Sequence, residues 1–191
     1  MASSLPYLQA YPAGLQQQVA QLLAVPQGIE QWLLRRHPQA HSLRSDTALY
    51  AYVDALKISR LRKAGVLHSV AYDNKLHVMR NALGLHTRKA VVQGGRLNAR
   101  HEIRIASLFK QMPEPFLKMI VAHELAHLRE PDHDKNFYAL CCHLEPEYHQ
   151  LEFEVRVYLT HLDAGGPRRW APLETRAGLL DSPPGMRGLC R

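Results

Sequence analysis

The segment His123-Glu-Leu-Ala-His127 constrains the fold more than any other part of the sequence, because its chemistry requires an α-helix. Residues i and i+4 lie on the same face of a helix, so the imidazoles of His123 and His127 can converge on one metal ion. Glu124 is rotated by about 100° from His123, which keeps its carboxylate beside the ion, where it can take a proton from water. The segment therefore predicts a helix that carries two metal ligands and a general base.

A third ligand is needed, because catalytic zinc sites have three protein ligands and one open position. His133 follows His127, and Pro131 between them is expected to end the helix and turn the chain back toward the ion. The spacing is that of the extended H-E-x-x-H-x-x-G-x-x-H pattern, with Glu130 in place of glycine. We favour His133 and expect one Zn²⁺ per chain, with Mn²⁺ or Ni²⁺ as alternatives. The competing third ligands are glutamates of the following helices, namely Glu145, Glu147, Glu152 and Glu154.

Other polar side chains near this segment allow two interpretations each. Asp132 and Asp134 flank His133 and can orient its imidazole, although capping of the next helix explains them equally well. Tyr138, Tyr148 and His149 can donate a hydrogen bond to a transition state, although aromatic residues on a helix more often belong to the core.

The hydrophobic periodicity predicts an α+β fold with a single domain over residues 1–163. Residues 1–65 have a helical pattern, with a break at Pro26-Gln27-Gly28 and an N-cap at Ser45. From Val66 the pattern changes to alternation, which predicts a small antiparallel sheet of three or four strands. The expected strands are 66–72, 76–80, 86–93 and 97–108, and the helices expected after them are 113–129, 134–144 and 146–161.

Residues 164–191 lack an apolar period and are rich in Gly, Pro and Arg, so we expect a flexible basic tail there. The tail carries five arginines and two acids, so +3 of the net charge of +7 belongs to it and +4 to residues 1–163. That remainder is too small to indicate nucleic acid as a partner, and no zinc-finger spacing or RNP-type motif indicates one. We expect a peptide or a nucleotide as substrate and no obligate protein partner.

The sheet region carries cations that can hold the phosphates of a nucleotide, since phosphate binding uses Arg and Lys. Solvated strand faces are the alternative explanation. The candidates are Arg88, Lys89, Arg96 and Arg104.

The three cysteines form no C-x-x-C pair, and two of them, Cys141 and Cys142, are adjacent, which is poor geometry for a disulfide framework. We therefore expect reduced thiols and a cytoplasmic location. The N-terminus does not have the pattern of a signal peptide, and no segment approaches the roughly 18 apolar residues of a membrane span.

The segments 121–128 and 132–153 closely resemble the YgjP-like metallopeptidase-domain family, which is related to the SprT and WLM groups of small gluzincin-type hydrolases. The resemblance implies a minigluzincin-like fold, with His123 and His127 as ligands, Glu124 as general base and His133 as third ligand. Many members carry an Arg-Trp-Gly-Ser-Cys strand, whereas residues 91–97 read Val-Val-Gln-Gly-Gly-Arg-Leu here, which argues against the usual peptide-binding edge. This branch also resembles proteins labelled nucleotide pyrophosphatases, of UTP in particular.

These observations predict a zinc-dependent hydrolase of the metallopeptidase type, in which the metal and Glu124 activate a water molecule. One alternative is a metal-dependent nucleoside triphosphate pyrophosphatase that uses the same site on UTP. A DNA-associated protease of the SprT or WLM type is a second alternative, and a structural zinc site without catalysis is a third.

Overall fold

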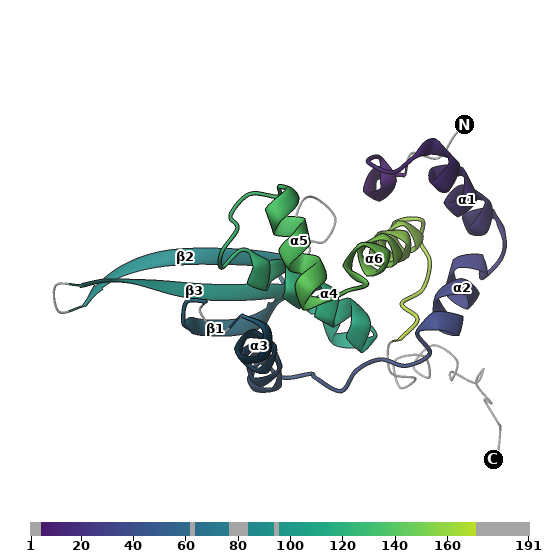
Figure 1. Ribbon diagram of the computed structural model, residues 1–191. Coiled ribbons are helices and arrows are strands. Elements are labelled where there is room, and N and C mark those ends of the chain that lie inside the picture. The colour runs from purple at the N-terminus through teal and green to yellow at the C-terminus, as the bar shows by residue number, and fades with distance from the viewer. Residues whose placement is uncertain (1–4, 62–63, 77–83, 94–95, 171–191) are drawn as a thin grey trace, which may run out of the picture.

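The computed structural model describes residues 5–61, 64–76, 84–93 and 96–170, with the backbone alone for 84–93 and 96–100. The three strands follow one another between two groups of helices, as in the predicted α+β class (Figure 1). The elements are the 3-10 helix η1 (Pro6–Leu8), α1 (Ala13–Ala24), α2 (Gly28–Arg36), α3 (Asp46–Arg60), β1 (Leu67–Asp73), β2 (Gly84–Gln93), β3 (Arg96–Ala106), the 3-10 helix η2 (Ser107–Gln111), α4 (Glu114–Ala126), α5 (Lys135–Leu144) and α6 (Tyr148–Asp163).

The helix boundaries in the N-terminal part follow the signals in the sequence. Gln27 adopts the left-handed conformation, with a φ of 60°, and a Cβ on Gly28 would overlap the backbone carbonyl of Leu22, so the chain turns between α1 and α2 where a small residue fits. α3 begins after Ser45, whose Oγ accepts a hydrogen bond from Ala48 N at 3.1 Å. The predicted break between the first two helices and the predicted N-cap are both confirmed.

The sheet is mixed, with the strand order β1-β3-β2, so the prediction of an antiparallel sheet is wrong for one of its two pairings. β2 and β3 form an antiparallel hairpin, but β1 runs parallel to β3, with Val70 opposite Ile103. β3 lies between β2 and β1. It runs antiparallel to β2 and in the same direction as β1. Alternation in the sequence indicates which face is buried and not which strand is the neighbour. Of the predicted strand 76–80, residues 77–80 lie outside the described residues.

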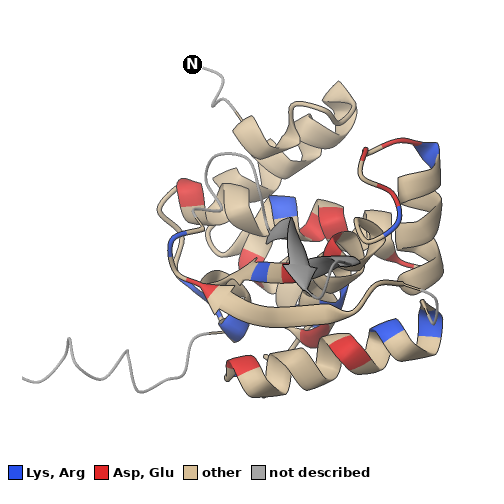
Figure 2. Cartoon of the chain, turned by 90° about the vertical axis from the view of Figure 1, so that its left-hand side faces the viewer, with Lys and Arg blue, Asp and Glu red and all other residues tan. Residues whose placement is uncertain are grey.

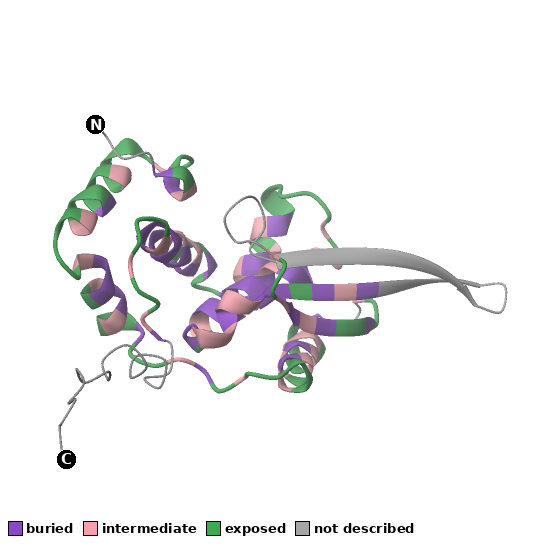
Figure 3. Ribbon diagram, turned by 180° about the vertical axis from the view of Figure 1, so that it is seen from behind, coloured by how far each residue is buried: buried purple, intermediate pink, exposed green. Residues whose placement is uncertain are grey.

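Helix α4 occupies the centre of the fold. It contacts the sheet on one side and α5 and α6 on the other, whereas the β2–β3 hairpin extends away from the body (Figure 1). Most of α4 and the facing side of α6 are buried (Figure 3). Ile103 and Ile105 of β3 are buried, as are Phe116, Val121 and Leu125 of α4. The motif helix is therefore fixed by apolar packing, which holds its polar side chains in place.

The N-terminal helices are attached to α6 by buried polar contacts. Glu154 of α6 is fully buried and pairs with Nε of Arg36 at 2.6 Å and with Nε2 of His37 at 2.5 Å. Buried carboxylates need such partners. Figure 1 shows α1 and α2 curving around α6 on the side away from the hairpin.

The packed body extends beyond α6 to Trp170. The Trp170 ring is buried against Phe116 and Tyr158, and its Nε1 donates a hydrogen bond to the carbonyl of His37 at 2.9 Å. Residues 164–170 of the predicted tail thus end in a core residue, and residues 171–191 lie outside the described part of the chain. Among the described helices, none combines the length and apolar character needed to cross a bilayer.

Candidate metal centre

The three predicted histidine ligands lie together. One ring nitrogen from each of His123, His127 and His133 falls within 4.8 Å of the other two. Nε2 of His133 lies 3.1 Å from Nε2 of His123, and the rings of His127 and His133 are centred 4.8 Å apart. Catalytic zinc sites are built from three protein donors that converge in this way.

The local backbone explains how a histidine after the helix reaches the other two. α4 ends at Ala126, and the amides of Arg129 and Glu130 then bond back to the carbonyl of Ala126 at 3.0 Å. Glu130 stands where the extended motif has glycine, yet Gln27 is the only non-glycine residue with a positive φ in the described part of the chain. The bend is therefore made with ordinary backbone angles, and glycine is not required at this position.

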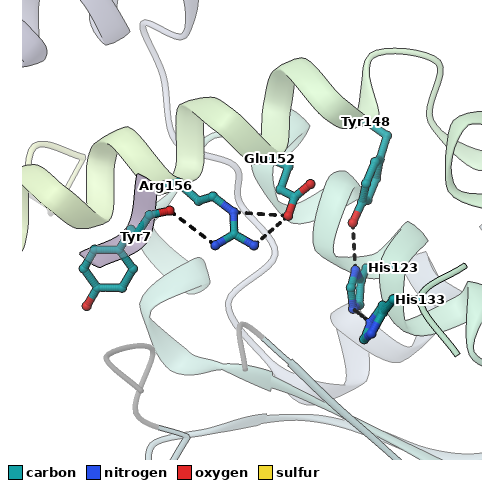
Figure 4. A network of polar contacts seen from close by, with 6 residues as sticks. All are labelled: Tyr7, His123, His133, Tyr148, Glu152 and Arg156. Atoms are coloured by element: carbon teal, nitrogen blue, oxygen red, sulfur yellow. Dashed lines mark hydrogen bonds and ion pairs between the residues drawn. The ribbon is translucent and has the colours of Figure 1, made fainter. Parts of the chain in front are cut away.

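Backbone and side-chain contacts set the direction of two of the imidazoles. The Nδ1 atom of His127 lies 3.1 Å from the carbonyl oxygen of Glu130. The Nδ1 atom of His123 shares a hydrogen bond of 2.8 Å with the hydroxyl of the buried Tyr148. Figure 4 shows Tyr148 on one side of His123 and His133 on the other. These contacts leave Nε2 of His123 directed at the centre of the cluster, an arrangement typical of metal-binding histidines.

The electrostatics of His123 and His127 favour the neutral imidazole, which is the form that binds a metal. Burial, which is the largest cause, and charge repulsion from His127 and His133 together lower the pKa of His123 to about 3. Burial also lowers the pKa of His127. His133, in contrast, is exposed, so the cluster is open to solvent on that side.

Glu124 is buried, and its Oε2 atom has no hydrogen-bond partner within the described part of the chain. Burial raises the pKa of Glu124 to about 8. An unpartnered carboxylate in the interior is costly unless a cation or water lies beside it. Three clustered imidazoles and the carboxylate that follows His123 on the same helix fit a divalent cation, and nitrogen donors of this kind suit zinc or nickel.

Of the four competing glutamates, one is exposed and three form ion pairs with basic side chains. Glu147 is exposed. The other three carboxylates form ion pairs, which are Glu145 with Lys118, Glu152 with Arg156 and Glu154 with Arg36 and His37. Of the predicted third ligands, His133 is the one that the structure brings to His123 and His127.

The two aspartates beside His133 have different roles. Asp134 caps α5, since its Oδ1 accepts a hydrogen bond from Phe137 N at 3.0 Å. Asp132 is exposed, and its backbone carbonyl accepts a hydrogen bond from Asp134 N at 2.8 Å. The capping interpretation therefore accounts for Asp134.

Of the three aromatic candidates, Tyr148 is hydrogen-bonded to His123, whereas Tyr138 and His149 lie near the outer side of the cluster. The Tyr138 ring is centred 6.4 Å from the His133 ring and 5.6 Å from the His149 ring.

Sequence reasoning assigned no function to Phe137, although its ring lies beside every histidine of the cluster. Its buried ring is centred 4.9 Å from the His123 ring and 4.6 Å from the rings of both His127 and His133. It forms an apolar surface on one side of the site. Its spacing of i+4 from His133 was the available signal.

Of the four predicted phosphate-binding cations, Arg104 is the one whose side chain lies within the described part of the structure. Arg104 is exposed and pairs with Asp73, with 3.2 Å between its Nη1 and the carboxylate. Figure 2 shows that, among the described residues in that view, Lys and Arg lie interspersed with Asp and Glu. The side chains of Arg88, Lys89 and Arg96 lie outside the described part of the structure.

A cavity of about 580 Å³ lies away from the histidines, between η1, the end of β1, η2 and the C-terminal half of α6. Its described lining includes Tyr7, Lys110 and Arg168 and none of the three clustered histidines. Leu159 lines it, and this residue follows Tyr148 by three helical turns on α6. At 1.5 Å per residue the two regions are roughly 16 Å apart along that helix.

Comparisons with known proteins agree with this geometry. The YgjP-like metallopeptidase domain family matches residues 38–156, a segment that contains all three histidines and Glu124. A protein of Escherichia coli (strain K12) named UTP pyrophosphatase is 53% identical over 163 residues, which cover 85% of this chain and 97% of that protein. No solved structure matches the chain significantly.

Proposed function

Because the chain belongs to the YgjP-like metallopeptidase domain family and is a hydrolase, we propose that it is a metal-dependent nucleoside triphosphate pyrophosphatase that converts UTP to UMP and pyrophosphate. The observation that carries this proposal is the 53% identity to the Escherichia coli UTP pyrophosphatase over 97% of that protein. The histidine cluster supports a metal-dependent mechanism for either substrate class.

In this proposal His123, His127 and His133 hold the ion. Zn²⁺ is the first choice because catalytic zinc sites made of three histidines are well established. When bound, such an ion lowers the pKa of water to about 7 and stabilises negative charge on phosphoryl oxygens. Tyr148 positions His123 through the 2.8 Å contact, and burial raises the pKa of its phenol, so that the hydroxyl stays protonated.

Glu124 accepts the proton from the attacking water as the water oxygen bonds to the α-phosphorus of UTP. The bond from that phosphorus to the bridging oxygen breaks, and Glu124 passes the proton to the departing pyrophosphate. Its position supports this role, because Glu124 is buried and its Oε2 atom has no hydrogen-bond partner within the described part of the chain, so that oxygen can take the proton.

Peptide hydrolysis is the second candidate. The family description favours it, and β2 lies at one edge of the described sheet, where an extended peptide can add as a further strand. The same ion and Glu124 would serve amide cleavage, with the proton passing to the departing amine.

The two candidates differ in product, so one assay separates them. The metal-loaded protein is incubated in parallel with UTP and with an unfolded protein, and released pyrophosphate and peptide fragments are measured. Pyrophosphate that depends on Glu124 supports our proposal, and fragments that depend on Glu124 support the peptidase. Glu147→Gln is the matched control, because Glu147 is an exposed glutamate of the same region.

We also propose a cytoplasmic location. Cys141 and Cys142 are free thiols, and burial raises the pKa of Cys141 to about 12. A buried thiol of this kind is a packing residue that suits a reducing compartment.

A further inference from the structure

Two aromatic side chains next to the metal centre have no part in the mechanism above. Tyr138 of α5 and His149 of α6 lie with their rings 5.6 Å apart and inclined by 37°. Tyr148 contacts both, at 6.3 Å from the Tyr138 ring and 5.4 Å from the His149 ring. We call the pair Tyr138 and His149 the aromatic platform.

The platform lies on the solvent side of the cluster. Tyr138 is half-buried and His149 is exposed, whereas Tyr148 is buried beneath them. The nearest ligand ring to Tyr138 is that of His133, at 6.4 Å, and His133 is the exposed member of the cluster. A molecule bound at the open side of the histidines can therefore reach these rings.

We propose that the aromatic platform stacks against the base of the nucleotide while its phosphates lie at the histidines. This inference rests on the proposed pyrophosphatase function. Every nucleobase has a π-face, and protein aromatic side chains bind bases by stacking on that face. Neither Tyr138 nor His149 is a fixed cation, so the pair suits the base rather than the phosphates.

The placement also agrees with the shape of the substrate. In UTP the ribose separates the base from the α-phosphorus, so a base site must lie beside the reacting centre and not at it. The Tyr138 ring of the platform is centred 6.4 Å from the ring of His133. Because stacking tolerates any base, the platform strengthens binding of the nucleoside portion without selecting uracil over other bases.

A catalytic role for the Tyr138 hydroxyl is the competing explanation, and Tyr138→Phe separates the two. This variant keeps the ring and removes the hydroxyl. Stacking predicts that Tyr138→Ala weakens nucleotide binding and that Tyr138→Phe restores it. A catalytic hydroxyl predicts that both variants lose kcat.

The experiment measures equilibrium binding to the metal-loaded full-length protein by calorimetry, with UMP as the ligand that has a base and pyrophosphate as the ligand that has none. Tyr138→Ala is expected to raise the Kd for UMP about tenfold, in keeping with typical stacking contributions, and to leave the Kd for pyrophosphate unchanged. The KM for UTP should rise in parallel. His143→Ala, which removes an exposed histidine of the same helix, serves as the matched control.

The inference is overturned if Tyr138→Ala binds UMP as tightly as the wild type, if it weakens UMP and pyrophosphate equally, or if Tyr138→Phe loses kcat. Hydrolysis by the wild type tests the proposed function separately. A protein that binds UMP through Tyr138 but releases no pyrophosphate from UTP would contradict the proposed reaction while supporting the base site.

Discussion

The hydroxyl of Tyr148 lies 2.8 Å from Nδ1 of His123, and the two residues come from different helices, α6 and α4. The contact fixes the ring of His123, so that its Nε2 atom faces the Nε2 atom of His133 at 3.1 Å. Because Tyr148 is buried, the phenol has little freedom to move away. In the proposed metal site, the tyrosine is thus part of the support that orients His123.

Replacing Tyr148 by phenylalanine tests this support. The ring packing remains and the hydrogen bond to His123 is lost, so we expect the affinity for Zn²⁺ to fall by about 10- to 100-fold, as for other partners of ligating histidines. Competition with a chromophoric chelator measures the affinity. Circular dichroism should show an intact fold, and an unchanged zinc Kd would contradict this role.

The choice of His133 over a downstream glutamate is tested by metal content. His133→Ala should lower bound zinc from about one ion per chain to a small fraction after gel filtration, because catalytic zinc needs three protein ligands. Glu147→Ala should retain the metal, since its side chain is exposed. The assignment is wrong if the two variants retain equal amounts of zinc.

The buried His41 predicts a pH dependence of stability. Its Nε2 lies 2.8 Å from the carbonyl of Phe109 and its Nδ1 accepts a hydrogen bond from Leu43 N at 3.0 Å, so the folded protein holds the neutral ring. Burial lowers the pKa of His41 in the folded protein, whereas in the unfolded chain it is about 6.5.

The unfolded state therefore binds the additional proton, and the free energy of unfolding falls as the pH drops below about 6.5, by at most about 1.4 kcal/mol per pH unit for this group. Urea unfolding of the metal-loaded protein between about pH 7.5 and about pH 5.5 measures the slope, and these limits are roughly one unit on either side of the reference pKa. His41→Gln should have a smaller slope. Equal slopes would rule out His41 as the titrating group.

We predict that Trp170 contributes to the free energy of unfolding of the packed domain, because its ring is part of the core and not of a flexible tail. Trp170→Ala removes a buried ring that contacts Phe116 and Tyr158, together with the hydrogen bond to His37, so we expect a loss of about 3 kcal/mol in the free energy of unfolding. Denaturant unfolding measures it. The neighbouring exposed Arg168→Ala should change stability by less than about 0.5 kcal/mol, and similar values for both variants would refute the packing role.

Features encoded by neighbouring residues could be predicted from the sequence. The break before Gly28 and the cap at Ser45 depend on contacts within a few positions, and so does the i and i+4 pairing of His123 with His127. The return of His133 to the same site followed from its short spacing. In each case a local rule of backbone geometry determines the outcome.

Features that depend on distant segments could not be predicted. The parallel pairing of β1 with β3 requires β3 to lie between two strands that precede it, which no alternation pattern indicates. Similarly, the pairing of Glu154 with His37 joins residues 117 positions apart. Tyr148 was a candidate from the sequence, but its attachment to His123 depends on how α6 packs against α4.

The measurement that tests the account most directly is pyrophosphate release from UTP by the wild type and by Glu124→Gln, with the zinc content of both proteins determined in the same samples. We expect the wild type to release pyrophosphate. The variant should keep its zinc while its rate falls by about 100- to 10,000-fold, the usual contribution of a general base. A zinc-loaded Glu124→Gln protein that hydrolyses UTP at the wild-type rate, or a zinc-loaded wild type that releases no pyrophosphate, would contradict the account.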